Sequence, residues 1–506
     1  MDPAKRIIVN TGVQYVKAII TTCLSLYSTR LILDALNVND FGIYSVIAGV
    51  IAMLGFITNA LIITTQRYLS LNKANEDTLL MRKLFSNSLL IHLVFGLLIS
   101  IILLSIEGLL FEHILNIEAT RLPTAKTVYV IAVFMLFITI LSSPFKALFI
   151  AHENIIFISL VEIVDSIIKV LLAIGLAYVT RDKLLVYASM LALILVLNLL
   201  AFGVYGLIRF KECSIIIRRK AIDWSCIRNL TGFAGWTTYG MACVAARNQG
   251  TAVVLNHFFG TVVNAAYGVA FQINGAIVFL VGSIQNAMNP QLMQAEGAGD
   301  RNRMLQMAIK QSKFSVAILS LVIIPLIAEM PTILGLWLKV VPEGTSMFCR
   351  FILFAFLFDQ ITLGLSSANQ AMGRIRLFTL LTYTPKLLYL VVIWLYLTKG
   401  GNAEGVMILY VIVECIVALI RIPYMKYKAG LRMKEYAYEV MLPTAIQAVA
   451  IAGICWLCTI YITLSYRFII TIACALTIGV ITGWWVVLNS PERGYTVQMI
   501  KKTIGI

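Results

Sequence analysis

Long apolar runs recur along the whole chain, and short segments rich in charged residues, glycine, proline or asparagine separate them. Most of these runs are long enough for an α-helix to cross the roughly 30 Å hydrocarbon core of a membrane. Transmembrane β-strands would instead show short alternating patterns. The pattern therefore predicts an all-α polytopic membrane protein with about fourteen transmembrane helices. The expected spans are 7–35, 41–66, 84–106, 126–150, 155–180, 184–208, 229–256, 263–290, 305–328, 346–372, 377–398, 404–425, 439–462 and 467–489.

The composition excludes a soluble core and gives the chain an expected orientation. Of the 506 residues, 60% are hydrophobic and only 13% are charged, whereas soluble domains carry about a quarter charged residues. The net charge of +16 comes mainly from short gaps between spans, so nucleic acid is not an expected partner. Gaps rich in Lys and Arg alternate with gaps poor in them. Because positive loops stay in the cytoplasm, we expect both termini to be cytoplasmic.

An internal repeat appears when the sequence is shifted by 223 residues. The second span then overlays the eighth, and Tyr44 falls on Tyr267, Leu69 on Leu292 and Asp77 on Asp300. An even number of spans in each repeat keeps both copies in one orientation, as in transporters whose lobes rock around a central site. We therefore expect two pseudo-symmetric six-helix lobes, 1–212 and 213–436, and two additional C-terminal helices within 437–506.

A stripe of small and polar side chains follows one face of the eighth span. Its spacings keep it on that face across the bilayer. Glycines and serines alone would fit close helix packing, whereas the amides favour a hydrated cavity. The stripe consists of Asn264, Gly268, Gln272, Gly275, Gly282, Asn286 and Asn289.

Three adjacent polar residues, Arg247, Asn248 and Gln249, interrupt the seventh span. Successive helical residues are 100° apart, so these side chains sweep about 200° and cannot all avoid lipid unless protein or water surrounds them. A polar group in hydrocarbon would cost several kcal/mol. The alternative is that the long Arg247 side chain snorkels to the outer surface.

Other ionisable residues within spans are functional candidates by default. Lys17 lies on a stripe of the first helix with Gln14, Thr21, Ser25 and Ser28, which we expect to form a second cavity wall.

Arg30 lies on nearly the opposite face of the first helix. It either forms an i,i+4 ion pair with Asp34 or contacts an anion. Lys386, in the eleventh span, either binds an anion or snorkels.

The acidic residues within spans are candidates for coupling to protons or cations. In the fifth span, Asp165 and Lys169 can pair locally, which leaves Glu162 as a candidate site. Asp359 and Glu414 are expected to be isolated carboxylates in the second lobe.

Pro144 and Pro290 each lie within a span near its cytoplasmic end. Proline removes a backbone hydrogen bond and permits a kink. These residues are candidate hinges, and a fixed bend is the alternative.

Several stretches resemble the Wzx-type flippases of O-antigen and capsule repeat units, in a variety typical of Bacteroides-like bacteria. The superfamily, called MOP, also contains multidrug and toxic-compound extruders and the lipid II flippase. The resemblance covers most of the first ten spans. The stretches that carry it are "LYSTRLILDALNVNDFGIYSVIAGV", "TTQRYLS", "SSPFKALFIAHEN" and "LNHFFGTVVNAAYGVAFQINGAI…IQNAMNPQL".

This resemblance implies a function in polysaccharide biosynthesis at the bacterial inner membrane. The substrate would be an oligosaccharide linked through pyrophosphate to undecaprenol, moved to the outer leaflet by alternating access. Other polysaccharide-assembly proteins would be further partners. Arginine is well suited to pyrophosphate, so Arg247 with Lys17 or Arg30 would hold that group. The sugar contacts would come from Asn248, Gln249, Gln272, Asn286 and Asn289.

No cofactor or metal is expected, and without a Walker motif the driving force would be a proton or sodium gradient or the membrane potential. The nearest rival is a cation-coupled multidrug exporter of the same fold, which should favour aromatic and acidic cavity residues. A membrane polymerase or ligase is less compatible because external gaps are short. We therefore expect no enzyme activity. The one gap with several candidate catalytic groups carries Glu107, Glu112, His113 and Glu118.

Overall fold

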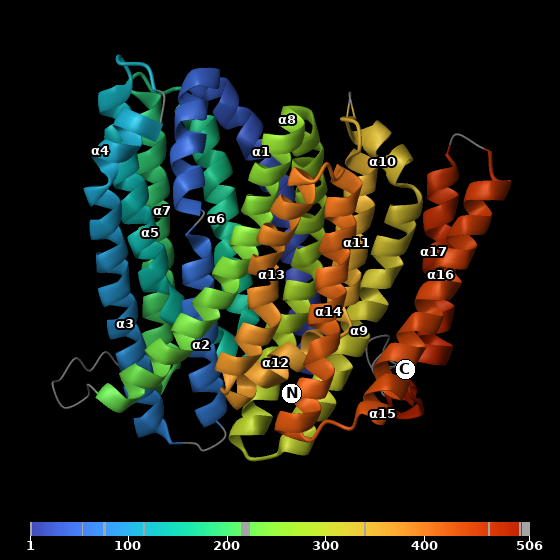
Figure 1. The fold of residues 1–506 in the computed structure, drawn as a ribbon. Coiled ribbons are helices and arrows are strands. Elements are labelled where there is room, and N and C mark those ends of the chain that lie inside the picture. Colours follow the sequence, from blue (N-terminus) through green and yellow to red (C-terminus); the bar gives the residue numbers. More distant parts are fainter. Residues whose placement is uncertain are drawn as a thin grey trace. The chain divides into compact units, whose positions relative to one another are not determined.

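The computed structural model describes residues 3–52, 54–73, 77–114, 117–213, 223–338, 341–463, 466–494 and 497. Within these ranges the chain is helical and contains no β-strand, so the all-α prediction is confirmed (Figure 1). Ten helices of the described part are long and apolar enough to cross a membrane. An eleventh candidate is a pair of helices, Thr345–Gln360 and Leu363–Met372, bent by 49°. The chain is a multi-pass membrane protein.

Three of the fourteen expected spans, 41–66, 155–180 and 229–256, are absent from this strongly apolar set. The described residues of all three are nevertheless mainly helical. The span 155–180 contains two acids and a lysine, and the span 229–256 contains Arg247 and its two amide neighbours. The expected number of helices therefore agrees roughly with the structure. Charged or amide residues interrupt 155–180 and 229–256, and two separate helices, Pro3–Ala52 and Gly55–Lys73, share 41–66.

The chain divides into an N-terminal unit, Asp2–Thr238, and a C-terminal unit, Tyr239–Ile506. This division lies inside one helix, α8, downstream of the expected lobe boundary at residue 212, and that boundary stays a prediction. The helices of the N-terminal unit that precede α8 are α1 (Pro3–Ala52), α2 (Gly55–Lys73), α3 (Thr78–Ser105), α4 (Glu107–Leu109), η1 (Leu110–Ile114), α5 (Leu122–Ala151), α6 (Ile155–Leu176), α7 (Lys183–Arg209) and η2 (Lys211–Cys213).

Two apolar clusters form the core of the N-terminal unit. The larger joins α1, α5 and α7 and includes Tyr129, which is 1% exposed and donates a hydrogen bond to the Leu103 carbonyl oxygen at 2.8 Å. The smaller is aromatic and includes Phe149, which packs edge-to-face against Phe157 with ring centroids 5.4 Å apart. Figure 1 shows α3, α5 and α7 side by side, in agreement with their packing.

Helix α8 (Trp224–Gly297) contains both the seventh and the eighth expected spans. Its one residue with non-helical backbone angles is Gly260, at φ 80° and ψ −170°. Residues that carry a side chain rarely adopt this positive φ, so the glycine permits the change of direction here. Pro290 lies inside α8 and Pro144 inside α5. Neither proline ends its helix, and their function as hinges stays a prediction.

Helices α9 to α17 belong to the C-terminal unit. A large apolar cluster joins α8, α9, α11, α13 and α14, and smaller clusters lie around α12 and between α16 and α17. The elements are α9 (Arg301–Ala328), α10 (Met330–Trp337), α11 (Thr345–Gln360), α12 (Leu363–Met372), α13 (Ile375–Thr398), α14 (Ala403–Ala429), α15 (Met433–Tyr436), η4 (Ala437–Met441), α16 (Leu442–Tyr461), α17 (Arg467–Thr482) and η5 (Gly483–Val487).

The internal repeat is visible in matched helices of the two units. Helices α3 and α9 each contain 28 residues, and both begin 223 positions apart after an aspartate that caps the helix. The Asp77 side chain accepts hydrogen bonds from the Leu79 and Leu80 backbone N–H groups, and Asp300 accepts one from Arg303. Aspartate satisfies otherwise unpaired backbone donors at a helix start, so both copies retain the same local signal.

Helices α16 and α17 lie beside α9 (Figure 1). Two buried charges, one on α9 and one just after it, hold this C-terminal part of the chain in place. Lys313, which is fully buried, donates to both carboxylate oxygens of Glu492, at 2.9 and 2.7 Å. Glu329, also fully buried, follows α9 and accepts two hydrogen bonds of 3.0 Å from Arg467. The C-terminal helices are therefore fastened to α9 by ion pairs as well as by apolar packing.

Candidate functional site

A cluster of ionisable groups lies within the membrane helices of the N-terminal unit. The Lys17 ammonium group on α1 is 2.8 Å from one carboxylate oxygen of Glu162 on α6. Lys146 on α5 is 3.3 Å from the other oxygen. The Glu162 and Lys146 side chains are 33% and 32% exposed, and that of Lys17 is 11% exposed. One carboxylate therefore holds two lysines in a partly open environment.

A second carboxylate of this cluster lies one helical turn away on α6. Asp165 binds the Lys169 ammonium group at 2.7 Å, so the local ion pair expected from their spacing is present. The Asn198 amide on α7 donates to Asp165 at 2.8 Å. We call Lys17, Lys146, Lys169, Glu162 and Asp165 the N-terminal charge cluster.

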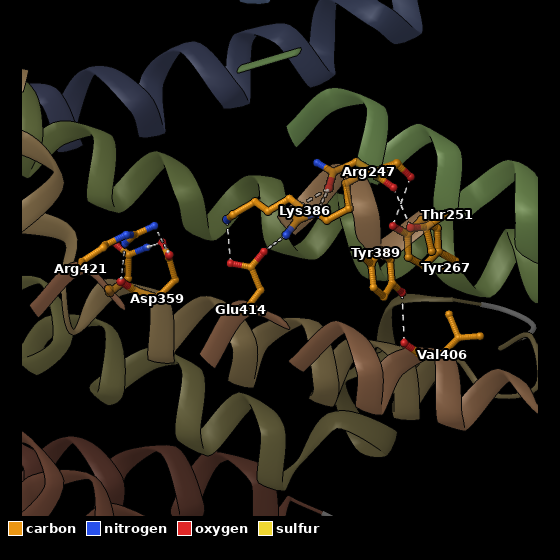
Figure 2. A network of polar contacts seen from close by, with 11 residues as sticks. Arg247, Thr251, Tyr267, Asp359, Lys386, Tyr389, Val406, Glu414 and Arg421 are labelled. Carbon is orange, nitrogen blue, oxygen red and sulfur yellow. Dashed lines mark hydrogen bonds and ion pairs between the residues drawn. The ribbon is translucent and has the colours of Figure 1, made fainter. Parts of the chain in front are cut away.

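The C-terminal unit has a similar but more buried arrangement. Glu414 on α14 accepts a hydrogen bond from the Arg247 guanidinium on α8 and lies 2.7 Å from the Lys386 ammonium on α13. In Figure 2, Arg247 and Lys386 converge on the Glu414 carboxylate from two helices. The three side chains are only 5% to 8% exposed. The Arg247 guanidinium also lies 4.6 Å from the centre of the Tyr410 ring.

A separate ion pair joins α11 and α14 in the same unit. Arg421 lies 2.8 Å from Asp359, and Figure 2 shows this pair to one side of Glu414. Glu414 and Arg421 are seven residues apart and therefore share one helix face. We call Arg247, Lys386, Arg421, Glu414 and Asp359 the C-terminal charge cluster. Each charge cluster combines three cations with two carboxylates, so each carries one excess positive charge.

The expectation that Asp359 and Glu414 are isolated is wrong. Both are paired, and so is Glu162, which was expected to lack a local partner. The sequence pattern missed these pairs because each carboxylate binds cations of other helices, including Lys146 near the end of the span 126–150 and Arg421 near the end of the span 404–425. The i,i+7 spacing of Glu414 and Arg421 was the available signal. Partners on different helices leave no such periodic trace.

The amides beside Arg247 have different environments. Asn248 accepts hydrogen bonds from the Arg247 Nε and Nη2 groups at 3.0 and 2.9 Å and so steadies the guanidinium. Gln249, which lies 200° further around the helix, is exposed, and its role in substrate binding stays a prediction. The Arg30 side chain lies outside the described residues.

The expected stripe on the eighth span is not uniform. Gln272 is exposed, Asn286 is partly buried, and Asn289 accepts a 3.0 Å hydrogen bond from Gln311 on α9. Asn289 therefore links α8 to α9. The roles of Gln272, Asn286 and Asn289 in substrate binding stay predictions.

A further cluster ties together helix ends of the N-terminal unit. Arg121 precedes α5, lies 3.0 Å from Asp182 at the start of α7, and also pairs with Asp40 on α1. Burial raises the pKa of Asp182, but hydrogen bonds from Arg121 and Thr124 outweigh burial and leave this pKa below its usual value. In the described part of the chain, no group of three or more His, Cys, Asp or Glu side chains could hold a metal ion.

Comparison with known proteins identifies the fold. No protein-family model and no curated protein matches the sequence. A MATE crystal structure in the bent conformation is similar with a TM-score of 0.75 and 13% identity over 86% of this chain and 98% of that chain. An outward-facing MATE-family multidrug resistance transporter of the MOP superfamily gives 0.72 and 14% identity over 85% and 96%.

A third similar structure is a MOP superfamily transporter from Pyrococcus furiosus, described as having a binding pocket of reverse polarity that suggests a different function. Its TM-score is 0.71, with 13% identity over 86% of this chain and 97% of that chain. Identities at this level establish architecture alone. The chain has the fold of the MATE and MOP superfamily transporters.

Proposed function

We propose that this protein is a flippase that moves undecaprenyl-pyrophosphate-linked oligosaccharides from the inner to the outer leaflet by alternating access. The observation that carries the proposal is the excess of cations over carboxylates in both charge clusters. Charges inside a membrane are costly and are retained at substrate and ion pathways. A surplus cation attracts an anionic headgroup, and a pyrophosphate is such a group.

The N-terminal charge cluster is the better candidate for first contact with this headgroup. Glu162 neutralises only one of the two lysines that it holds, and about a third of the Glu162 and Lys146 side chains is exposed. A pyrophosphate could therefore replace the carboxylate as partner of Lys17 and Lys146 without opening a sealed core. Displaced, Glu162 would be free to accept a proton or bind a cation, which gives the proposal a route to ion coupling.

Arg247 would act at a later stage of the same cycle. It is nearly buried and already pairs with Glu414, so it would release Glu414 to Lys386 when it contacts the headgroup. The proposed setting is the bacterial inner membrane, with both termini in the cytoplasm and other polysaccharide-assembly proteins as partners.

A cation-coupled multidrug exporter is the second candidate, because several similar structures are MATE transporters. An organic cation would require a surplus of carboxylates, whereas both charge clusters carry the opposite surplus. The net charge of the clusters therefore favours an anionic substrate over a cationic drug.

Reconstituted protein can separate the two candidates. Vesicles would contain either undecaprenyl-pyrophosphate-linked oligosaccharide with a radiolabelled sugar or the cationic dye ethidium. We expect the labelled lipid to become accessible to an externally added lectin, with no faster movement of the dye than in protein-free vesicles. Movement of the dye without the lipid would reject the flippase and favour the exporter.

A further inference from the structure

A pocket of about 440 Å³ lies within the N-terminal unit, between α1, α6 and α7. This volume lies within the roughly 300–1,000 Å³ range of small-molecule sites. Hydroxyl groups dominate its lining, together with one lysine and one tyrosine ring. The lining includes Thr21, Ser25, Ser28, Thr29, Ser166 and Lys169.

Some of these hydroxyl groups have unused hydrogen-bonding capacity. Ser28 is only 6% exposed and lines the pocket, yet its hydroxyl hydrogen-bonds to no other described residue. The Ser25 hydroxyl likewise has no partner among the residues that the structure describes. The Thr29 hydroxyl donates to the Ser25 carbonyl oxygen at 2.9 Å, and the Ser166 hydroxyl donates to the Glu162 backbone carbonyl oxygen at 2.9 Å. Each hydroxyl oxygen can still accept a bond.

The pocket carries little net charge. Its one lysine, Lys169, is neutralised by Asp165 at 2.7 Å. An isolated anion gains nothing from such a pair, whereas a neutral polyol can both donate to and accept from the serine and threonine hydroxyls. An acyl chain would leave the buried Ser28 hydroxyl unsatisfied, which is unfavourable. The chemistry therefore selects a neutral, hydroxyl-rich ligand.

The pocket begins one helical turn from the Lys17–Glu162–Lys146 group. Thr21 follows Lys17 by four residues on α1, and Ser166 follows Glu162 by four residues on α6. Four residues rise about 6 Å along a helix. A surplus cation and a neutral hydroxyl pocket therefore adjoin along the same two helices, in the order in which a pyrophosphate adjoins its first sugar.

We propose that this pocket binds the sugar residue bonded directly to the pyrophosphate of a lipid-linked saccharide. This inference rests on the proposed function and adds to it a sugar subsite made by hydroxyl groups of α1 and α6. It differs from the amide stripe of the eighth span, which the sequence favoured for sugar contacts.

The test measures how much affinity the sugar adds. Full-length protein in nanodiscs is titrated with undecaprenyl pyrophosphate, with undecaprenyl-pyrophosphoryl-N-acetylglucosamine and with free chitobiose. We expect the wild type to bind the sugar-bearing lipid about ten times more tightly than the bare lipid. The double variant Ser25→Ala/Ser28→Ala should lose most of this gain and retain its affinity for the bare lipid.

Two control variants protect the interpretation. Ser45→Ala removes an exposed α1 hydroxyl that bonds to its own helix at Phe41 and does not line the pocket, so it should retain the tenfold gain. Ser25→Thr keeps a hydroxyl at the exposed pocket position and should retain most of it. Alanine favours helices, and thermal unfolding of each variant checks that the fold persists.

The possible outcomes separate this inference from the proposed function. If the wild type binds both lipids equally, or if the double alanine variant keeps the tenfold gain, the sugar subsite is wrong while the flippase proposal stands. If free chitobiose binds as tightly as the sugar-bearing lipid, the pocket serves a soluble sugar and the inference fails. If the wild type binds neither lipid, both proposals fail.

Discussion

The two charge clusters have the same balance of cations and carboxylates but differ in how far they are exposed. In each unit one glutamate holds two cations, and a second ion pair lies nearby. Glu162 is 33% exposed, however, whereas Glu414 is 5% exposed. Ions in the open cluster can exchange partners with water or a headgroup, while those of the buried one stabilise the fold unless something displaces them. At the same charge balance, the difference in exposure therefore predicts ligand exchange in the N-terminal charge cluster and stabilisation of the fold by the C-terminal charge cluster.

The most direct test of this difference between the clusters is to neutralise the glutamate that binds two cations in each of them. Glu414→Gln leaves Arg247 and Lys386 facing each other in a buried environment, and removal of one partner from a buried pair costs about 3–5 kcal/mol. We expect a large fall in the amount of folded protein and in its unfolding temperature in detergent. Glu162→Gln is the matched change in an open setting and should cost under about 1 kcal/mol. Equal losses would refute the distinction.

Loss of Arg247 tests whether the buried cluster also serves transport. In Arg247→Ala, Lys386 still neutralises Glu414 at 2.7 Å, so we expect nearly normal protein levels but export of surface polysaccharide reduced below detection. Arg247→Lys should recover part of the export if charge matters more than the planar guanidinium. Disappearance of the alanine variant from the membrane would instead indicate a purely structural arginine.

Substitutions in the N-terminal charge cluster should change the transport rate more than they change stability. Lys17→Gln removes the surplus charge of the Lys17–Glu162–Lys146 group, and we expect at least a tenfold slower appearance of labelled lipid-linked saccharide, equivalent to about 1.4 kcal/mol. Lys83→Gln makes the same change at an exposed position on α3 and should leave the rate unchanged. Identical rates for both variants would remove the open cluster from the proposed pathway.

The ion pairs of Arg121 with Asp182 and Asp40 allow a smaller test, in which the change in stability depends on pH. Asp182→Asn weakens its bonds to Arg121 and Thr124, and we expect a loss of about 1 kcal/mol at pH 7. Because the folded-state pKa of Asp182 is lowered, its stabilisation is present above the unfolded pKa of about 4 and is lost as pH falls through the folded pKa. The difference in stability between variant and wild type should therefore begin to shrink below about pH 4 and vanish once the pH is below the folded-state pKa. A constant difference at all pH values would exclude this carboxylate as the titrating group.

The helix caps provide a comparison in which the two units should agree. Asp77→Ala and Asp300→Ala each remove an equivalent cap, and each should cost about 1 kcal/mol. Thermal unfolding of both single variants measures the two costs. A cost at one site only would show that the repeat is preserved in sequence without being equivalent in energy.

The fold was largely predictable because hydrophobic length and the offset of 223 residues are local, periodic signals. Asp77 and Asp300, for example, mark the starts of two helices of equal length. The i,i+4 pair of Asp165 and Lys169 was predictable for the same reason.

The partners of Glu162 and Glu414 were not predictable in this way. Lys17 is 145 residues from Glu162, and Arg247 is 167 residues from Glu414. Ion pairs across helices depend on how helices pack and rotate, and hydropathy carries no information about either.

The fastening of the last helices to α9 has a consequence for shortening the chain. A protein ending before α16 would lose Arg467 and Glu492 and would leave Lys313 and Glu329, both fully buried, without these counter-charges. Deleting helices α16 and α17 would therefore leave two unpaired charges, Lys313 within α9 and Glu329 just after it. A viable version without α16 and α17 would need compensating replacements at both positions, for instance methionine and glutamine, before the deletion is made.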